Sequence, residues 1–288
     1  MYITTMWVGD DAMWVGGTVN PKEDDPDQSA RLARWDGKRW MRSVLNAPGV
    51  LAVEGHRGAL WATGLEGQIW SLQRGAWRVI WRRLEEGQQL TIGTDGDVWV
   101  AGKAEIAHRG PGDGRQPWLD APLHGRGGLV VALDAGDDGT IGALVSPRDQ
   151  DDDRLEIWDR DRQRFVPNDG ATFEGMEVMA IRSKDDVVIG GLSGVHRWDG
   201  QRWNPIMTPS EIYDVRALAY RGREVVIVGR AKSGTGVRVV GDGPSPWQPL
   251  KTDPRDVMTA GPNVLAVGPD GTLWVADGSQ GTVWFHRP

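Results

Sequence analysis

The heptapeptide Arg34-Trp35-Asp36-Gly37-Lys38-Arg39-Trp40 decides the fold, because it recurs as Arg197-Trp198-Asp199-Gly200-Gln201-Arg202-Trp203 with six of seven positions identical. Asp-Gly between strand-forming residues predicts a β-hairpin with a two-residue type I′ turn, since both central positions need a positive φ. In such a turn Trp35 pairs with Lys38, and Trp40 pairs with Ala33. The two indoles are then expected on one face of the hairpin as diagonal neighbours.

The sequence around this hairpin divides into seven copies of one unit, which gives about 41 residues per copy over 288 residues. That period fits a four-stranded propeller blade and is too short for a βαβ unit with its connections. Each copy has a turn followed by a short apolar second strand. These second strands are predicted at Met13–Gly16, Leu60–Thr63, Val98–Ala101, Ile141–Val145, Val187–Gly190, Glu224–Val228 and Leu273–Ala276. An aromatic residue marks the fourth strand in six copies: Trp40, Trp77, Trp118, Phe165, Trp203 and Trp247.

The repeat predicts an all-β chain that forms a single seven-bladed β-propeller of four-stranded antiparallel blades. We expect one domain over residues 1–288, with blades at about 1–46, 47–86, 87–124, 125–172, 173–209, 210–253 and 254–288. Most of the sixteen tryptophans are expected to fill the gaps between stacked blades, as large aromatics usually do.

The last blade is expected to have only three strands. Tyr2–Val8 already serves as the first strand of the first blade, and the chain ends directly after the third strand of the last blade, 281–286. The outer edge of that strand would then have free backbone donors and acceptors, which favours addition of a strand from another chain. The alternative is a solvated edge that its short length and the terminal Arg287-Pro288 protect.

Composition excludes several classes of function. The net charge of −7 argues against a direct nucleic-acid partner, because an acidic chain repels phosphate backbones. The absence of cysteine rules out disulfides, thiolate metal sites and cysteine nucleophiles. No segment approaches 18 uninterrupted apolar residues and the first residues do not resemble a signal peptide, so no membrane partner and a cytoplasmic location are expected.

Three stretches resemble propeller repeats of known bacterial families. The patterns Leu60-Trp61-Ala62-Thr63-Gly64 and Gly194-Val195-His196-Arg197-Trp198-Asp199-Gly200 are similar to the propeller repeat of two-component regulator sensors. The last copy, with Asp270-Gly271-Thr272-Leu273-Trp274-Val275-Ala276-Asp277, resembles NHL-type and virginiamycin B lyase-type repeats. These resemblances imply the shape of a blade. The lyases use a histidine with an acidic partner, and that pair cannot be placed on this sequence.

No catalytic, cofactor-binding or metal-binding constellation is recognisable. The five histidines are His56, His108, His124, His196 and His286, and none shares a metal-binding or catalytic motif with another. Glycine pairs such as Gly112 and Gly114 lack the strand-then-helix context of a phosphate loop. We therefore predict that the chain is not an enzyme and needs no cofactor.

Binding residues are expected on the longer loops. Two acidic insertions, 22–27 and 149–153, lie between the second and third strands of their blades and are predicted to be exposed. Other candidates lie in the long connections between blades or in the tryptophan-arginine cluster after Val79-Ile80. The candidates for partner binding are Asp24, Asp25, Asp27, Trp81, Arg82, Arg83, His124, Arg126, Asp151, Asp152, Asp153 and Tyr213.

These observations favour a non-catalytic protein–protein interaction scaffold, or a subunit of a bacterial multiprotein assembly, that binds through an acidic, loop-rich rim. Its partner would be another protein with a basic surface. The alternative is a lectin-like propeller that binds a glycan or a small ligand, and the third hypothesis is a lyase or hydrolase.

Overall fold

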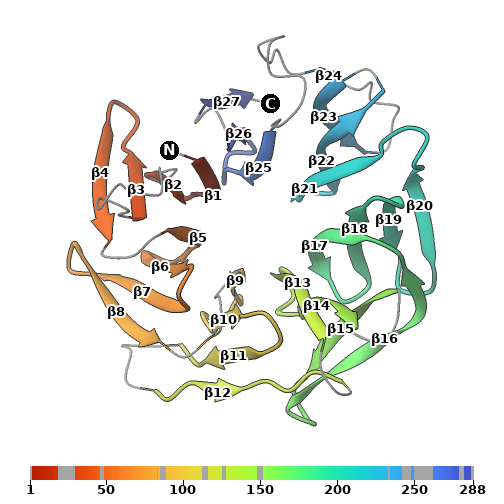
Figure 1. The fold of residues 1–288 in the computed structure, drawn as a ribbon, viewed down its shortest axis with the longest axis horizontal. Helices are drawn as coiled ribbons and strands as arrows, with labels where there is room; N and C mark the ends of the chain where they lie inside the picture. The colour runs from red at the N-terminus through yellow and green to blue at the C-terminus, as the bar shows by residue number, and fades with distance from the viewer. Residues whose placement is uncertain are drawn as a thin grey trace, which may run out of the picture. The chain divides into compact units, whose positions relative to one another are not determined.

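The computed structural model describes residues 2–18, 30–45, 49–82, 84, 89–111, 116–124, 128–147, 152–232, 234–241, 248–249, 262–278 and 282–286. Every sheet in it is antiparallel and has its strands in sequence order. Six sheets have four strands and the last has three, so the chain is an all-β, seven-bladed β-propeller (Figure 1), as predicted. Among the described residues, no helix is long and apolar enough to cross a membrane.

The chain divides into two compact units. The first comprises residues 1–90 and 252–288 and contains blades 1, 2 and 7. The strands of blade 1 are β1 (Tyr2–Val8), β2 (Met13–Thr18), β3 (Ala30–Trp35) and β4 (Trp40–Leu45). Those of blade 2 are β5 (Val50–His56), β6 (Ala59–Gly64), β7 (Gln68–Gln73) and β8 (Ala76–Arg82). Those of blade 7 are β25 (Pro262–Val267), β26 (Leu273–Asp277) and β27 (Thr282–His286).

The second unit comprises residues 91–251 and contains blades 3 to 6. Blade 3 has β9 (Gln89–Ile92), β10 (Val98–Ala101), β11 (Ile106–Arg109) and β12 (Leu119–Asp120). Blade 4 has β13 (Gly128–Ala135), β14 (Ile141–Pro147), β15 (Asp153–Asp159) and β16 (Arg164–Phe173). Blade 5 has β17 (Met176–Ser183), β18 (Asp186–Gly191), β19 (Gly194–Trp198) and β20 (Trp203–Met207). Blade 6 has β21 (Asp214–Arg221), β22 (Glu224–Ala231), β23 (Gly234–Val240) and β24 (Gln248–Pro249).

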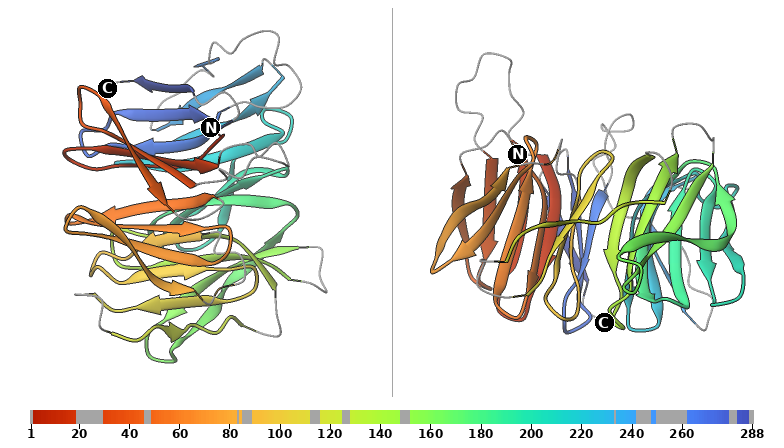
Figure 2. Two further views of the ribbon diagram at one scale, coloured as in Figure 1. Left: turned by 60° about the vertical axis from the view of Figure 1, so that its left-hand side comes forward. Right: turned by 90° about the horizontal axis from the view of Figure 1, so that it is seen from below.

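All seven predicted second strands are present as β2, β6, β10, β14, β18, β22 and β26. Of the aromatic markers, four lie in fourth strands, whereas Trp118 directly precedes β12 and Trp247 falls outside the described residues. The side views in Figure 2 show the sheets of each unit as successive layers.

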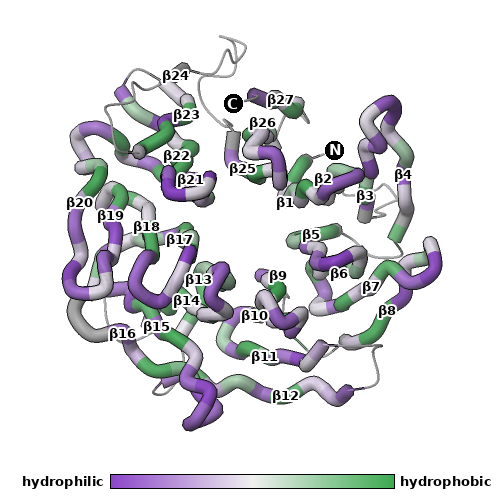
Figure 3. The backbone as a smooth tube through the Cα atoms, turned by 180° about the vertical axis from the view of Figure 1, so that it is seen from behind, coloured by the Kyte–Doolittle hydropathy of each residue, from purple (hydrophilic) through white to green (hydrophobic). Residues whose placement is uncertain are grey.

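Apolar side chains from facing sheets form the core. Between blades 1 and 2, Trp14, Leu32 and Val50 pack with Trp70. Figure 3 shows hydrophobic residues along central strands such as β22, whereas the β15–β16 hairpin, with Asp159–Arg164, is hydrophilic. The prediction that tryptophans pack in the core is confirmed for the most buried ones, which are Trp14, Trp61, Trp70, Trp99, Trp158 and Trp198.

The prediction of a two-residue turn at Asp36-Gly37 was wrong. Trp35 pairs directly with Trp40, and the N–H of Asp36 donates to the carbonyl of Arg39, so the hairpin loop has four residues. The Asp36 carboxylate accepts hydrogen bonds from the N–H groups of Lys38 and Arg39 at 2.9 Å. This side-chain turn needs a positive φ only at Gly37, where φ is 88°. The copy in blade 5 has the same register and the same φ of 88° at its glycine.

Candidate functional site

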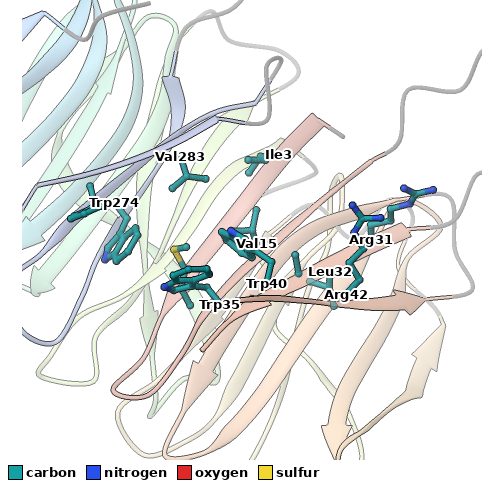
Figure 4. Close-up of a pocket in the computed structure, with 12 residues that line it drawn as sticks. Ile3, Val15, Arg31, Leu32, Trp35, Trp40, Arg42, Trp274 and Val283 are labelled. Atoms are coloured by element: carbon teal, nitrogen blue, oxygen red, sulfur yellow. The ribbon is translucent and has the colours of Figure 1, made fainter. Parts of the chain in front are cut away.

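A pocket of about 530 Å³ lies between blade 1 and blade 7, both in the first unit. Figure 4 shows Trp274 at one end of it, Arg31 and Arg42 at the other, and Trp35 between them. The twelve lining residues include ten apolar or aromatic side chains. They are Ile3, Met13, Val15, Arg31, Leu32, Ala33, Trp35, Trp40, Arg42, Trp274, Val283 and Phe285.

The strand register of blade 1 builds one wall of the pocket. Met13 pairs with Trp35, and Trp35 in turn pairs with Trp40, so these side chains share one face of the sheet. Arg42 pairs with Ala33 on that same face, two residues further along β4. The rings of Trp35 and Trp40 lie 5.5 Å apart, and Trp40 remains 45% exposed. This wall therefore runs from an aromatic end to a basic end.

Blade 7 builds the opposite wall. Trp274 of β26 pairs with Phe285 of β27, and their ring centroids are 5.2 Å apart. Val283 lies two residues before Phe285 and lines the same pocket. Phe285 is 59% exposed, the largest value among the exposed large apolar side chains of the described residues. An aromatic side chain this exposed beside a pocket is typical of a binding surface.

The pocket's polar chemistry is cationic. Its described lining residues include no carboxylate, histidine, amide or hydroxyl side chain, and its only charged groups are the guanidinium groups of Arg31 and Arg42. Within the described part of the chain, neither guanidinium forms an ion pair or hydrogen bond. The lining can therefore bind an anionic, partly apolar group, and it offers no side chain suited to transfer a proton near pH 7.

The described residues among those predicted from the sequence lie outside the pocket lining. Trp81 is half-buried in β8, where it pairs with Ile69, and Arg82 ends that strand. His124 and Tyr213 are exposed in the connections that precede β13 and β21. Asp24, Asp25, Asp27, Arg83, Arg126 and Asp151 lie outside the described residues, as does the side chain of Arg82.

Asp152 and Asp153 are the acidic candidates that the structure describes, and only Asp152 is exposed as predicted. The prediction for Asp153 was wrong, because it is 4% exposed at the start of β15. Its carboxylate accepts a hydrogen bond of 2.6 Å from the N–H of Met176 at the start of the next blade. Asp153 therefore links two blades, and the acidic run of the sequence concealed this role.

The exposed candidates make no direct contact with one another. Among the described residues, no hydrogen bond, ion pair or ring contact joins His124, Tyr213 and Asp152 to one another. The His124 loop is instead held by Glu156, whose buried carboxylate accepts from the His124 N–H at 2.9 Å and from Arg154 Nε at 2.7 Å. The backbone of His124 is thus held in place, while its side chain is exposed.

The histidines occupy separate places in the fold. His108 stacks on Trp99 at 4.3 Å within an aromatic cluster, and burial lowers its pKa while nearby Asp95 acts to raise it. His196 contacts Phe173 at 4.7 Å, and His286 is exposed in β27. The described residues contain no group of three or more histidine or acidic side chains placed to hold a metal ion.

A buried polar network in blades 5 and 6 was missed by the sequence reasoning. Asp186 accepts two hydrogen bonds from Arg197, at 2.8 and 2.9 Å, and one from the Tyr220 hydroxyl at 2.6 Å. Arg182 forms an ion pair with the same carboxylate. Burial acts to raise the pKa of Asp186, but the hydrogen bonds from Arg197 and Tyr220 outweigh it and hold the pKa below its usual value. The Asp186 carboxylate is thus bound by three side chains from three other strands, which favours a structural role for the network.

The pocket was also missed, although its signal is present in the sequence. The expected three-stranded last blade leaves part of the facing blade uncovered, and Trp40 and Phe285 lie in that region. The sequence alone gave no reason to place Arg31 and Arg42 beside them, because those arginines come from two strands of blade 1.

Known proteins match this chain in structure and not in sequence. No protein-family model matches the chain, and no curated protein matches it in sequence. A streptogramin B lyase structure matches with a TM-score of 0.67 and 13% identity, over 98% of this chain and 93% of that one. A chain of a mitotic checkpoint complex matches with a TM-score of 0.70 and 14% identity, over 100% of this chain and 90% of that one.

A third solved structure, YCF48 bound to D1 peptide, matches with a TM-score of 0.71 and 17% identity, over 100% of this chain and 92% of that one. At these identities the likeness concerns the fold. The expected resemblance to propellers of the virginiamycin B lyase type is confirmed at that level, and the chain has the fold of a seven-bladed β-propeller.

Proposed function

We propose that this propeller is a non-catalytic protein-binding subunit of a larger assembly in the cytoplasm. The observation that carries the proposal is the exposed aromatic pocket between blades 1 and 7, with Trp40 at 45% and Phe285 at 59% exposure. Tryptophan and arginine side chains at a partly open apolar surface are the chemistry of protein-interface hot spots. Two of the structural neighbours are a chain from a checkpoint complex and a propeller bound to a peptide, which supports a protein partner in general terms.

The absence of catalysis is part of this proposal. One neighbour is a lyase, which keeps an enzymatic function open on grounds of fold alone. The described lining of the pocket has neither a general base nor a nucleophile, which favours binding over chemistry.

Recognition of a glycan or another small ligand is the second candidate. A volume of about 530 Å³ lies within the range of small-ligand pockets, and indole faces are good platforms for sugar rings. The described lining lacks the carboxylate and amide side chains that would bind sugar hydroxyls, which makes a protein partner the better candidate.

The charge of the acidic loops predicts that the partner has a basic surface. Asp24, Asp25, Asp27, Asp151 and Asp152 are expected to attract a basic surface over a distance of about 8 Å at physiological salt. Replacing all five with asparagine should slow association with the partner at low ionic strength, with little change in the dissociation rate. An unchanged association rate would remove these loops from the binding mechanism.

The test of the proposed function is affinity purification of the tagged protein from its native source, followed by a glycan array. Stoichiometric recovery of one protein, and its reconstitution from the two purified components, supports the proposal. Binding to a defined glycan with no recoverable protein partner would establish the second candidate instead.

A further inference from the structure

The blade 1 hairpin has an internal counterpart that shows what its pocket lacks. Trp198 and Trp203 of blade 5 correspond to Trp35 and Trp40 in the repeated heptapeptide. The ring centroids are 5.7 Å apart in blade 5 and 5.5 Å apart in blade 1, with an interplanar angle of 48° in both pairs. The two hairpins are therefore the same structural element in two different surroundings.

In blade 5, the preceding blade covers this element. Phe173, the last residue of the fourth strand β16, lies 5.2 Å from Trp203 and 4.7 Å from His196. Phe173 and Trp203 both pack against the buried cluster between blades 4 and 5, which includes Trp198. A side chain from a fourth strand thus fills the slot over the second tryptophan of the hairpin.

In blade 1, the preceding blade has no such strand. Blade 7 ends with β27, and among the described residues no strand pairs with its outer edge. Ala33 stands where blade 5 has His196, which leaves the slot beside Trp40 wider still. The pocket therefore occupies the place where the fourth strand of blade 7 would pack against blade 1.

We propose that this place takes an extended segment of a partner protein, which pairs with β27 as a fourth strand and inserts side chains into the pocket. The inference rests on the proposed protein-binding function and specifies the mode of binding and the sequence of the segment. Main-chain hydrogen bonds to β27 would hold the segment, and pockets for alternate side chains would select it.

The walls of the pocket specify the segment's sequence. In the six complete blades the fourth strand runs antiparallel to the third, so the incoming segment runs antiparallel to β27. Along the incoming segment, the residue opposite Phe285 therefore comes first and lies at the aromatic end of the pocket. The residue opposite Val283 follows two positions later. Further along, alternate residues approach Arg31 and Arg42. The segment is therefore a large apolar residue followed, two to four positions later, by Asp or Glu.

Charge complementarity decides between possible occupants. Both pocket arginines are free of ion pairs within the described residues, so a carboxylate from a partner would gain charge-assisted hydrogen bonds there. A second copy of this chain offering its own β27 would bring the pattern Thr282-Val283-Trp284-Phe285-His286, which has no carboxylate. An acidic, partly apolar segment of another protein fits better.

The test uses the full-length protein and a fluorescein-labelled eight-residue peptide. One face of the peptide carries Phe, Val and Glu in that order, and threonine occupies the alternate positions. Fluorescence polarisation should show saturable binding to the wild-type protein. Trp40→Ala and Arg42→Glu should each weaken binding at least about tenfold, which corresponds to about 1.4 kcal/mol. A peptide with Lys in place of Glu should regain affinity for Arg42→Glu and lose it for the wild type.

Arg39→Glu is the matched control, because it makes the same change of charge on the β3–β4 hairpin outside the pocket lining. This variant should bind the peptide as the wild type does. Hydrogen exchange provides the main-chain readout: amides within 282–286 should gain protection when the peptide is bound. That gain distinguishes strand pairing from insertion of a side chain alone.

Three outcomes would overturn the inference. They are equal binding by the wild type and Arg42→Glu, unchanged protection of 282–286 in the complex, or concentration-dependent dimerisation through β27 in analytical ultracentrifugation. The wider protein-binding function would survive a failure of this kind if the partner recovered from the native source still bound Trp40→Ala and Arg42→Glu with wild-type affinity.

Discussion

Replacing Trp198, the first tryptophan of the blade 5 hairpin, and Trp40, the second tryptophan of the blade 1 hairpin, by alanine compares a buried tryptophan with one that lies open at the pocket. Full burial of an indole removes roughly 200 Å² of surface from water, which at about 25 cal/mol per Å² is about 5 kcal/mol. Trp198 is 9% exposed, so Trp198→Ala should lower the free energy of unfolding by about 4–5 kcal/mol. Trp40 is 45% exposed, so Trp40→Ala should cost only about 3 kcal/mol.

Urea denaturation followed by circular dichroism measures this difference without relying on the fluorophores that the variants remove. The midpoint should fall further for Trp198→Ala, by the equivalent of about 2 kcal/mol at a common slope. Addition of a peptide that fills the pocket should raise the midpoint of the wild type and leave that of Trp40→Ala nearly unchanged. Equal losses for the two variants would mean that Trp40 is already covered in the free protein, and the argument for an open pocket would fail.

Three further predictions concern the scaffold. Burial raises the pKa of Asp134 to about 7, although hydrogen bonds to its carboxylate act to lower it. Between about pH 4 and pH 7 the folded state therefore keeps a proton that the unfolded state has lost. The free energy of unfolding should fall over this range by up to about 1.4 kcal/mol per pH unit. Asp134→Asn should flatten that slope in denaturation curves at pH 5 and pH 8, since the amide oxygen can still accept from Ile181. Asp186→Asn should cost about 3 kcal/mol, at the low end for a broken buried pair because its arginines are partly exposed, and an unchanged thermal midpoint would contradict the network's structural role. Gly55→Ala should lower the free energy of unfolding by about 1–3 kcal/mol, because the added Cβ would lie 2.5 Å from the ring of Trp7 in blade 1. A stability equal to that of the wild type would show that blades 1 and 2 can move apart enough to make room for the methyl group.

The repeat determined the architecture because its signals are local. Asp-Gly turns, apolar second strands and aromatic fourth strands each report on a few neighbouring residues, and seven copies of weak signals reinforce one another. The three-stranded last blade followed by counting strands. The turn itself was predicted wrongly, because the Asp36 carboxylate satisfies two backbone N–H groups and makes a four-residue loop more favourable than the type I′ turn.

The candidate site depended on the tertiary structure. Exposure of acidic residues was read from their charge, yet Asp153 is buried because the N–H of Met176, from the next blade, needs an acceptor there. Asp186 follows another aspartate in the sequence, and its partners Arg197, Tyr220 and Arg182 come from three other strands. Hydrogen bonds between residues far apart in sequence leave no periodic signal.

The sequence by itself determined that the chain repeats a blade-sized unit seven times, and it predicted the lack of a fourth strand in the last blade that the described residues show. Only the tertiary structure decided what that lack produces, because the pocket is made by side chains of two blades at opposite ends of the chain. Trp40 and Trp203 both end the repeated heptapeptide, which differs at one position, and they differ in exposure because a fourth strand covers Trp203 and not Trp40. The surroundings of a residue are set by packing between blades, which the local sequence does not encode.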